Sequence, residues 1–130
     1  INIPQAGKNY GWPVISFGVN YDGTPVGSGK SEMPGMEQPI KTWVPSIAPS
    51  GMAFYDGALF PAWKGNLFVG ALAGRMLARL IVDGDKVTGE ERLLGDLRER
   101  IRDVRAGPDG ALYLVTDNNA GRILKVVPAK

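Results

Sequence analysis

Three arginines stand two residues apart in the stretch RERIR, namely Arg98, Arg100 and Arg102. Residues two apart point to the same side of an extended chain, so these side chains would share one face of a strand. Arginine is permanently charged and its planar fork matches a carboxylate, so such a face would bind an anion. The simpler interpretation is a solvated surface on which Glu99 and Asp103 pair with neighbouring arginines, because exposed ion pairs are common and weak.

A second candidate is the loop KTWVPSIAPSG, residues 41–51. Its two prolines stiffen the chain, Ser46 offers a hydroxyl group, and Trp43 offers a flat apolar face. These features suit a ligand contact. They suit equally well a structural connection with a packed tryptophan, which is the interpretation favoured by the loop alone.

Two further loops carry polar or aromatic groups. In NYGWP, residues 9–13, Tyr10 either packs under the loop or presents a backbone carbonyl to a hard cation such as calcium. Asn20 and Asp22 lie nearby in sequence, but the spacing of a calcium-binding EF-hand loop is missing, which favours packing. The stretch TDNNAG, residues 116–121, is rich in turn-forming residues and predicts a hairpin loop.

Composition limits the chemistry further. The chain has 130 residues, of which 44% are apolar and 22% charged, as in one soluble domain or less. It contains neither cysteine nor histidine, which excludes disulfides, thiolate metal sites and a histidine base within these residues. The net charge of +2 does not indicate a nucleic-acid partner, and no apolar run predicts a membrane span. The opening INIPQAGKNYGWP has no initiator Met or signal segment, as expected of a piece of a longer protein.

Residues 1–50 are rich in Gly, Pro, Asn and Ser and predict a long loop region with short extended pieces. From residue 51 onward, short runs of aliphatic, β-branched and aromatic residues predict strands, and no stretch predicts a helix. Asp-Gly in VDGD (82–85) predicts a type I′ hairpin turn, and GPDG (107–110) predicts a second turn. The expected strands lie within residues 51–55, 65–72, 75–82, 86–94, 103–107, 111–116 and 122–127.

An internal repeat organises these strands. GNLFVGALAGRMLARLIV and GALYLVTDNNAGRILKVV start at Gly65 and Gly110, about 45 residues apart, and share a Gly-x-Leu-aromatic start and a Gly-Arg pair after the loop. Repeats of this length made of short strands are typical of β-propeller blades, of which about 4–8 close a ring. The fold class is therefore all-β, with about two to three blades in residues 1–130. The alternating arginines would then begin the first strand of a blade, beside the central channel.

Four motifs in the same order, GKNYGWP, KTWVPSIAPSGMAFY, GNLFVGAL and RIRDVRAGPDGALYLVTD, resemble the C-terminal part of the soluble pyrroloquinoline-quinone-dependent sugar dehydrogenases. This is the glucose/sorbosone dehydrogenase family, and its bacterial aldose sugar dehydrogenase branch is the most similar. The resemblance implies a six-bladed propeller, a periplasmic or secreted location, and calcium as a second cofactor. It also implies oxidation of an aldose to a lactone, with the quinone accepting the hydride.

The resemblance also implies roles for individual residues. Arg100 and Arg102 match an Arg-x-Arg pair that binds the quinone in this family. Ser46 matches a hydroxyl-bearing position near the cofactor, and Trp43 stands one residue away from a neighbouring aromatic position. Tyr10 matches a residue that binds calcium through its backbone, away from the active site.

Two departures from the family pattern open an alternative. Ala73 stands where some members have a lysine that contacts the cofactor, and Arg75 is the residue that could replace it. The family's catalytic histidine and the ligands of its cofactor-bridging calcium lie upstream of these residues, so the fragment is expected to be inactive alone. The sugar would be contacted largely by other blades, and the sequence does not indicate the electron acceptor. The alternative is a non-catalytic propeller that binds a protein or a glycan, which Ala73 favours.

Overall fold

The computed structural model describes residues 1–129 and divides the chain into two compact units, Ile1–Ser46 and Ile47–Lys130. The first unit consists of turns and irregular chain, with one isolated β-bridge between Val19 and Pro25. Ile15 and Val26 are its buried apolar side chains. Within the described residues, the first strand of the chain begins at Pro49.

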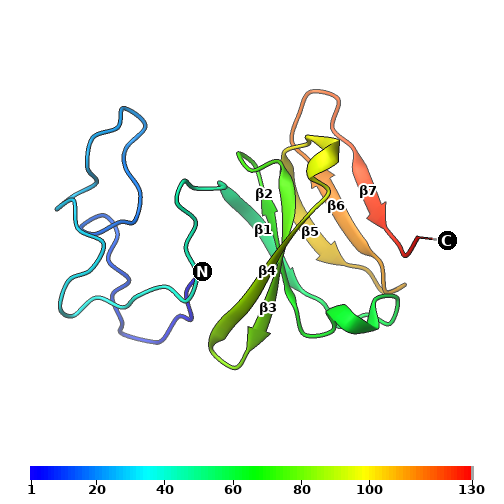
Figure 1. The fold of residues 1–130 in the computed structure, drawn as a ribbon, viewed down its shortest axis with the longest axis horizontal. Helices are drawn as coiled ribbons and strands as arrows, with labels where there is room; N and C mark the ends of the chain where they lie inside the picture. The colour runs from blue at the N-terminus through cyan, green and yellow to red at the C-terminus, as the bar shows by residue number, and fades with distance from the viewer. Residues whose placement is uncertain (130) are drawn as a thin grey trace. The chain divides into compact units, whose positions relative to one another are not determined.

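The second unit contains seven strands in two antiparallel sheets (Figure 1). Each strand overlaps one of the seven segments predicted from the sequence, because short apolar runs bounded by Gly, Pro and Asp favour strands. The four-stranded sheet has the order β1-β2-β3-β4 and the three-stranded sheet has the order β5-β6-β7. The strands are β1 (Pro49–Phe54), β2 (Leu67–Ala71), β3 (Met76–Asp83), β4 (Lys86–Leu93), β5 (Ile101–Ala106), β6 (Leu112–Thr116) and β7 (Ile123–Val126).

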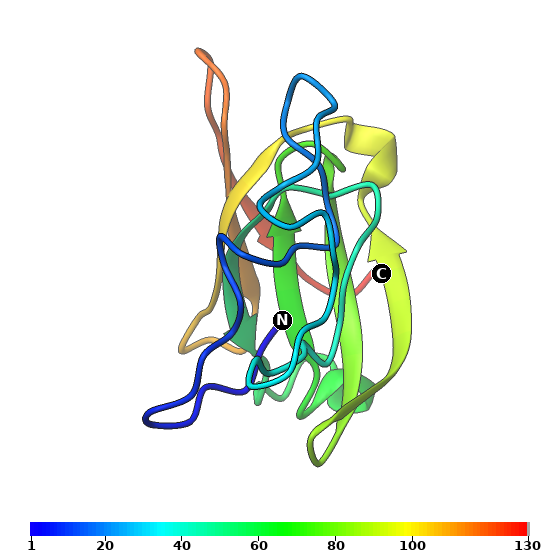
Figure 2. The ribbon, with the colours of Figure 1, turned by 90° about the vertical axis from the view of Figure 1, so that its left-hand side faces the viewer.

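Helical structure in residues 1–129 is limited to two single-turn 3-10 helices, η1 (Pro61–Trp63) and η2 (Gly95–Leu97). Figure 2 shows η2, in yellow, where the chain leaves β4 and turns towards β5. The residues on either side of η2, Leu94 and Arg98, both have positive φ angles, of 60° and 53°. Both residues therefore lie in left-handed backbone between β4 and β5, just before the arginine pair.

The hairpin predicted at VDGD is confirmed, but its turn type was predicted wrongly. Asp83 pairs with Lys86, so the two-residue loop is Gly84-Asp85. Gly84 has a φ of 56°, whereas Asp85 is not among the residues with positive φ. A type I′ turn needs positive φ at both central positions, and a type II′ turn needs it only at the first, where glycine stands here. The turn predicted at residues 107–110 is present, with the Gly110 amide donating to the Gly107 carbonyl at 3.0 Å.

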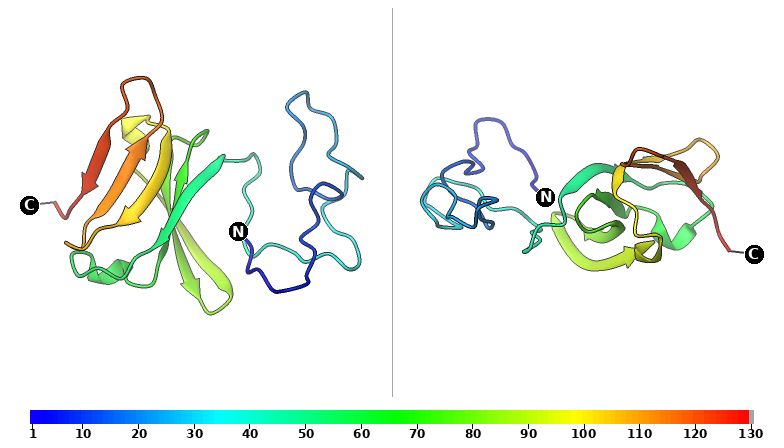
Figure 3. Two further views of the ribbon diagram at one scale, coloured as in Figure 1. Left: turned by 180° about the vertical axis from the view of Figure 1, so that it is seen from behind. Right: turned by 90° about the horizontal axis from the view of Figure 1, so that it is seen from above.

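The sequence repeat corresponds to a structural repeat. The first copy forms the β2–β3 hairpin and the second forms the β6–β7 hairpin. Gly65 and Gly110, the matched first glycines, both have a φ of 80°. The matched Leu67 and Leu112 are both buried. Two successive antiparallel sheets built from one repeated pattern are β-propeller blades, one with four strands and one with three (Figure 3).

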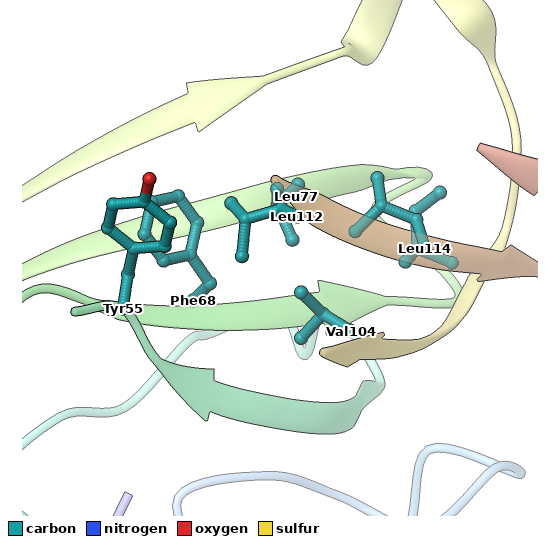
Figure 4. Packing of buried hydrophobic residues seen from close by; sticks show 7 residues of the cluster. Tyr55, Phe68, Leu77, Val104, Leu112 and Leu114 are labelled. Atoms are coloured by element: carbon teal, nitrogen blue, oxygen red, sulfur yellow. The ribbon is translucent and has the colours of Figure 1, made fainter. Parts of the chain in front are cut away.

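The hydrophobic core of the second unit lies between the two sheets (Figure 4). Strand β5 lies beside β1, and the Ser50 hydroxyl donates to the Ile101 carbonyl at 2.6 Å. The buried Tyr55 hydroxyl donates to the Gly110 carbonyl at 2.6 Å, which links the end of β1 to the turn before β6. The core side chains that both sheets contribute are Tyr55, Phe68, Leu77, Ile101, Val104, Leu112 and Leu114.

The turn before β6 carries a charged cluster that makes stability depend on pH. The Lys125 ammonium, 2.7 Å from the Asp109 carboxylate, lowers the pKa of that carboxyl to about 2, with help from the Tyr113 hydroxyl and the Ala111 amide. A lowered folded-state pKa contributes stability above the ordinary aspartate pKa, and this contribution is lost as the pH falls towards the folded-state value. We expect Lys125→Ala to raise the Asp109 pKa towards its ordinary value and to reduce the part of acid unfolding that falls below pH ~4.

A carbon-13 NMR titration of the Asp109 carboxyl, in the polypeptide that contains these residues, measures this pKa directly. Lys86→Ala, at an exposed lysine of the β3–β4 hairpin, is the matched control and should leave the Asp109 titration unchanged. An Asp109 pKa that is the same in the Lys125→Ala variant and in the wild type would refute the assignment.

Candidate functional site

The candidate site lies where β5 begins, and a β-bulge shapes it. Ile101 pairs with Thr116 and Asp103 pairs with Val115, so Arg102 is the extra residue of the bulge. Ile101 and Val104 are both buried although they are three residues apart, whereas regular alternation would bury residues two apart. The bulge therefore allows Arg102 to remain exposed while Val104 enters the core. Bulges commonly redirect a side chain beside a functional site.

Arg100 and Arg102 converge on one carboxylate, that of Asp117. The Arg100 guanidinium donates to Asp117 Oδ2 from Nε at 3.1 Å and from Nη2 at 3.0 Å. Arg102 Nη2 donates to the same oxygen at 2.9 Å. The two arginine side chains are 43% and 53% exposed, so both guanidinium groups remain accessible from solvent. The prediction that these two arginines share one side of the chain is therefore confirmed.

The ion pair changes the acidity of Asp117. The hydrogen bond from Arg100 holds the pKa of the Asp117 carboxyl below its ordinary value, and the charge of Arg102 acts in the same direction. The carboxylate is therefore ionised at neutral pH. One carboxylate charge faces two guanidinium charges, so the cluster keeps an excess of positive charge that would attract an anion.

The loop that carries Asp117 is held to the start of β5 by a second cluster. Glu99 accepts a hydrogen bond from Asn118 Nδ2 at 2.7 Å and forms an ion pair with Arg122 Nη2 at 2.7 Å. The Asp117 amide donates to the Arg100 carbonyl at 2.8 Å, which continues the β5–β6 pairing by one residue. The residues predicted to form a hairpin loop are thus also the residues that fix the acid partner of the arginines.

The simpler interpretation of the arginine stretch holds only in part. Asp103 does pair with a neighbouring arginine, Arg105, at 3.0 Å. Glu99 instead pairs across the hairpin, with Arg122. The expectation that Arg98 joins the same face was wrong, because Arg98 lies before the strand in the left-handed region, and it is Asp117 that joins Arg100 and Arg102.

Sequence reasoning missed Asp117, because its place opposite Arg100 depends on the bulge at Arg102. The predicted strands 103–107 and 111–116 form a hairpin in which the residue after Thr116 lies opposite the residue before Ile101. A carboxylate at that position faces the first arginine of the pair across the two strands. The regular register of the predicted strands, continued without the bulge, would place Asp117 opposite Ile101, so the predicted hairpin alone does not identify Asp117 as the partner of Arg100.

Arg75 and Ala73, at the β2–β3 turn, are not brought into this cluster. Arg75 is exposed with a φ of 49°, and among residues 1–129 it forms no hydrogen bond or ion pair with Arg100, Arg102 or Asp117. The Ala73 amide donates to the Ile47 carbonyl at 3.0 Å, so this turn is fixed to the start of the second unit. A cofactor role for Arg75 remains a prediction.

The other predicted site residues lie in the first unit. The Lys41 ammonium stands 5.5 Å from the centre of the half-buried Trp43 ring, and Ser46 is exposed. The Tyr10 hydroxyl donates to the Ile3 carbonyl at 2.8 Å and accepts from the Gln5 amide at 2.7 Å. These contacts pack Tyr10 within its own loop, and cofactor or calcium roles for the three residues remain predictions.

The donor groups of the described residues suit one implied cofactor better than the other. A quinone that carries carboxylates matches the arginine pair, because exposed guanidinium groups with excess positive charge bind carboxylates through paired hydrogen bonds. Calcium prefers 6–8 oxygen ligands, and residues 1–129 contain no group of three or more His, Cys, Asp or Glu side chains that could hold a metal ion. The described residues therefore offer no cluster of acidic side chains for calcium, and the predicted contact is the backbone carbonyl of Tyr10. In the same part of the chain, no helix is both long and apolar enough to cross a membrane.

The fold and the site together define a class: β-propeller blades that present two exposed arginines on one shared carboxylate. The family model described as Glucose / Sorbosone dehydrogenase matches residues 1–125, and the chain belongs to this family. This finding confirms the resemblance recognised from the four motifs.

Individual relatives agree with the family. The chain is 52% identical over 129 residues to the aldose sugar dehydrogenase YliI of Escherichia coli (strain K12). The matched residues make up 98% of this chain and 35% of that protein. A crystal structure of a glucose dehydrogenase has 56% sequence identity and a TM-score of 0.92, over 98% of this chain and 38% of that one. The PQQ-bound form of an aldose sugar dehydrogenase from Streptomyces coelicolor has 27% sequence identity and a TM-score of 0.65. This match covers 95% of this chain and 34% of that one. The chain thus spans about a third of the length of the relatives it matches.

Proposed function

We propose that residues 1–130 form part of a dehydrogenase that oxidises an aldose to a lactone with pyrroloquinoline quinone. In this proposal, Arg100 and Arg102 bind the quinone through its carboxylates. The observation that carries the proposal is the convergence of two exposed guanidinium groups on a single carboxylate oxygen. The family membership and the PQQ-bound relative support the choice of this ligand.

When bound, the quinone would supply the two-electron acceptor for the hydride that leaves the anomeric carbon of the sugar. Arg100 and Arg102 would hold its carboxylates by charge-assisted hydrogen bonds and fix its orientation. Their permanent charges would also stabilise the negative charge that develops during reduction, an effect that needs no reorganisation if the guanidinium groups are already in place. The sugar's hydroxyl proton would go to a base outside residues 1–130, which contain no histidine.

The remaining predicted residues have supporting roles in this proposal. Ser46 and Trp43 would contact the cofactor, and Arg75 would replace the lysine contact that Ala73 does not make. Tyr10 would contribute its carbonyl to a calcium ion whose other ligands come from outside the described residues. The complete protein would act in the periplasm or be secreted.

The rival function is a propeller that binds a protein or a glycan without catalysis. Ala73 favours it, because a methyl group can neither donate a hydrogen bond nor carry charge where some family members have a lysine. The arginine pair would suit an anionic ligand in either case, and it is the family membership and the PQQ-bound relative that favour the quinone.

Steady-state reduction of an artificial dye separates the two functions. The complete polypeptide that contains these residues is supplied with calcium, pyrroloquinoline quinone and a panel of aldoses, with controls that omit either the quinone or the sugar. We expect turnover that requires both the quinone and the sugar. A folded, calcium-loaded protein without turnover on any aldose would favour the binding module and reject the dehydrogenase.

A further inference from the structure

We propose that Asp117 is a positioning residue that presents Arg100 and Arg102 as a fixed pair to the carboxylates of the bound cofactor. The inference rests on the proposed function, and it concerns how the arginines are held. All three hydrogen bonds from the arginine pair end on one oxygen, Asp117 Oδ2, at 2.9–3.1 Å. A single hydrogen-bond acceptor, Asp117 Oδ2, therefore fixes the two guanidinium groups relative to each other.

The position of Asp117 is itself set by independent contacts. Its amide donates to the Arg100 carbonyl at 2.8 Å, which ties its backbone to the start of β5. Its loop neighbours Asn118 and Arg122 both bind Glu99 at 2.7 Å. None of these contacts uses the Asp117 carboxylate. That group is therefore placed by the surrounding structure and is available to orient the arginines.

The charges around Asp117 leave the site ready for an anion. Residues 98–105 and 117–122 together carry five arginines and three carboxylates. Glu99 and Asp103 are paired with Arg122 and Arg105, outside the Arg100–Arg102 pair. Asp117 neutralises one of the two guanidinium charges that it holds. An incoming carboxylate therefore meets an oriented pair that still carries positive charge.

Removal of the Asp117 carboxylate would have two opposing effects on an anionic ligand. The negative charge that repels the ligand would disappear, but between exposed groups in water this repulsion is weak and screened by salt. The two long arginine side chains would also become free to move, and binding would have to order both of them again. The free-energy cost of ordering two side chains exceeds the free energy gained by removing one screened repulsion. Asp117→Ala should therefore weaken quinone binding by about tenfold.

Equilibrium titration of the complete apo polypeptide with pyrroloquinoline quinone measures this effect. The titration is repeated at about 0.01 M and about 1 M salt, where the Debye length is roughly 30 Å and 3 Å. Because high salt removes the compensating electrostatic gain, the deficit of Asp117→Ala should grow with salt. Asp117→Glu, which restores a carboxylate, should recover part of the affinity. Asp109→Asn, in the turn before β6, is the control and should bind as the wild type does.

A double-mutant cycle separates positioning from a general effect on the fold. If Asp117 acts through Arg102, the affinity lost on Arg102→Ala will be smaller in the Asp117→Ala background than in the wild type. Equal losses in both backgrounds, or quinone binding by Asp117→Ala that matches or exceeds the wild type at both salt concentrations, would overturn the proposal.

A readout without any ligand distinguishes failure of this inference from failure of the proposed function. Arg100 Nε donates to Asp117, so its proton should exchange slowly with water in the wild type and rapidly in Asp117→Ala, as followed by nitrogen-15 NMR. Fast exchange in the wild type would overturn the positioning role and leave the dehydrogenase standing. Slow exchange that depends on Asp117, in a protein that binds no quinone, would reject the cofactor role and leave Asp117 as the residue that orders the arginines.

Discussion

The double variant Arg100→Ala/Arg102→Ala is expected to lose sugar-dependent dye reduction by about 100-fold or more at a quinone concentration that half-saturates the wild type. Hydrogen bonds to charged groups contribute about 1.5–3 kcal/mol each. The loss of both guanidinium groups therefore costs at least about 3 kcal/mol of the free energy of cofactor binding. The two side chains are half exposed and lie outside the core, so the variant should fold. Part of the lost rate should return when the quinone concentration is raised.

Arg105→Ala is the matched control for this variant. Arg105 lies on the same strand and is also exposed, but it pairs with Asp103 and makes no contact with Asp117 among the described residues. Its turnover should equal that of the wild type. If Arg105→Ala loses as much activity as the double variant, the effect reflects the general charge of the strand, and the assignment to Arg100 and Arg102 is wrong.

The largest expected effect on stability comes from Phe68→Ala. Phe68 is fully buried on β2 and packs edge-to-face against Tyr55, with ring centres 6.1 Å apart, and against Trp63 at 5.3 Å. Truncation of a buried phenylalanine removes its transfer free energy and leaves a cavity, which together cost about 3–5 kcal/mol of the free energy of unfolding. Loss of this ring would weaken the packing between the two sheets, one of which carries the arginine pair at the start of β5.

Chemical denaturation followed by tryptophan fluorescence measures this loss, because Trp63 lies against Phe68. Phe68→Leu, which keeps most of the volume, should lose clearly less and remains measurable if the alanine variant does not fold. Tyr21→Ala removes an aromatic ring that is fully exposed in the first unit and should change stability by less than about 0.5 kcal/mol. A Phe68→Ala variant as stable as Tyr21→Ala would contradict the core described for the two sheets.

Most of the fold could be predicted from local sequence signals. The strands are short apolar runs between Gly, Pro and Asp, so β-propensity and turn chemistry together locate all seven of them. The type II′ turn at Gly84 was not predicted, because Asp-Gly in a sequence does not show which two residues occupy the centre of the turn. That choice depends on the register of β3 and β4, which also contains a bulge beside Val82.

The candidate site could be predicted less completely. The two-residue spacing correctly placed Arg100 with Arg102 but wrongly added Arg98, which lies before the strand in the left-handed region. The bulge at Arg102 was not foreseen, because it depends on which residues of β5 enter the core between the sheets. Asp117 was missed because it lies 15 residues from Arg102 and approaches it only through the β5–β6 pairing. Contacts that depend on strand register are the ones that local patterns do not specify.

Titration of the complete apo polypeptide with pyrroloquinoline quinone, without sugar or dye, shows most directly whether Arg100 and Arg102 hold the cofactor. We expect saturable binding by the wild type and by Arg105→Ala, and binding about 100-fold weaker or more by Arg100→Ala/Arg102→Ala. Equal quinone affinity in all three proteins would contradict the claim that this arginine pair holds the cofactor.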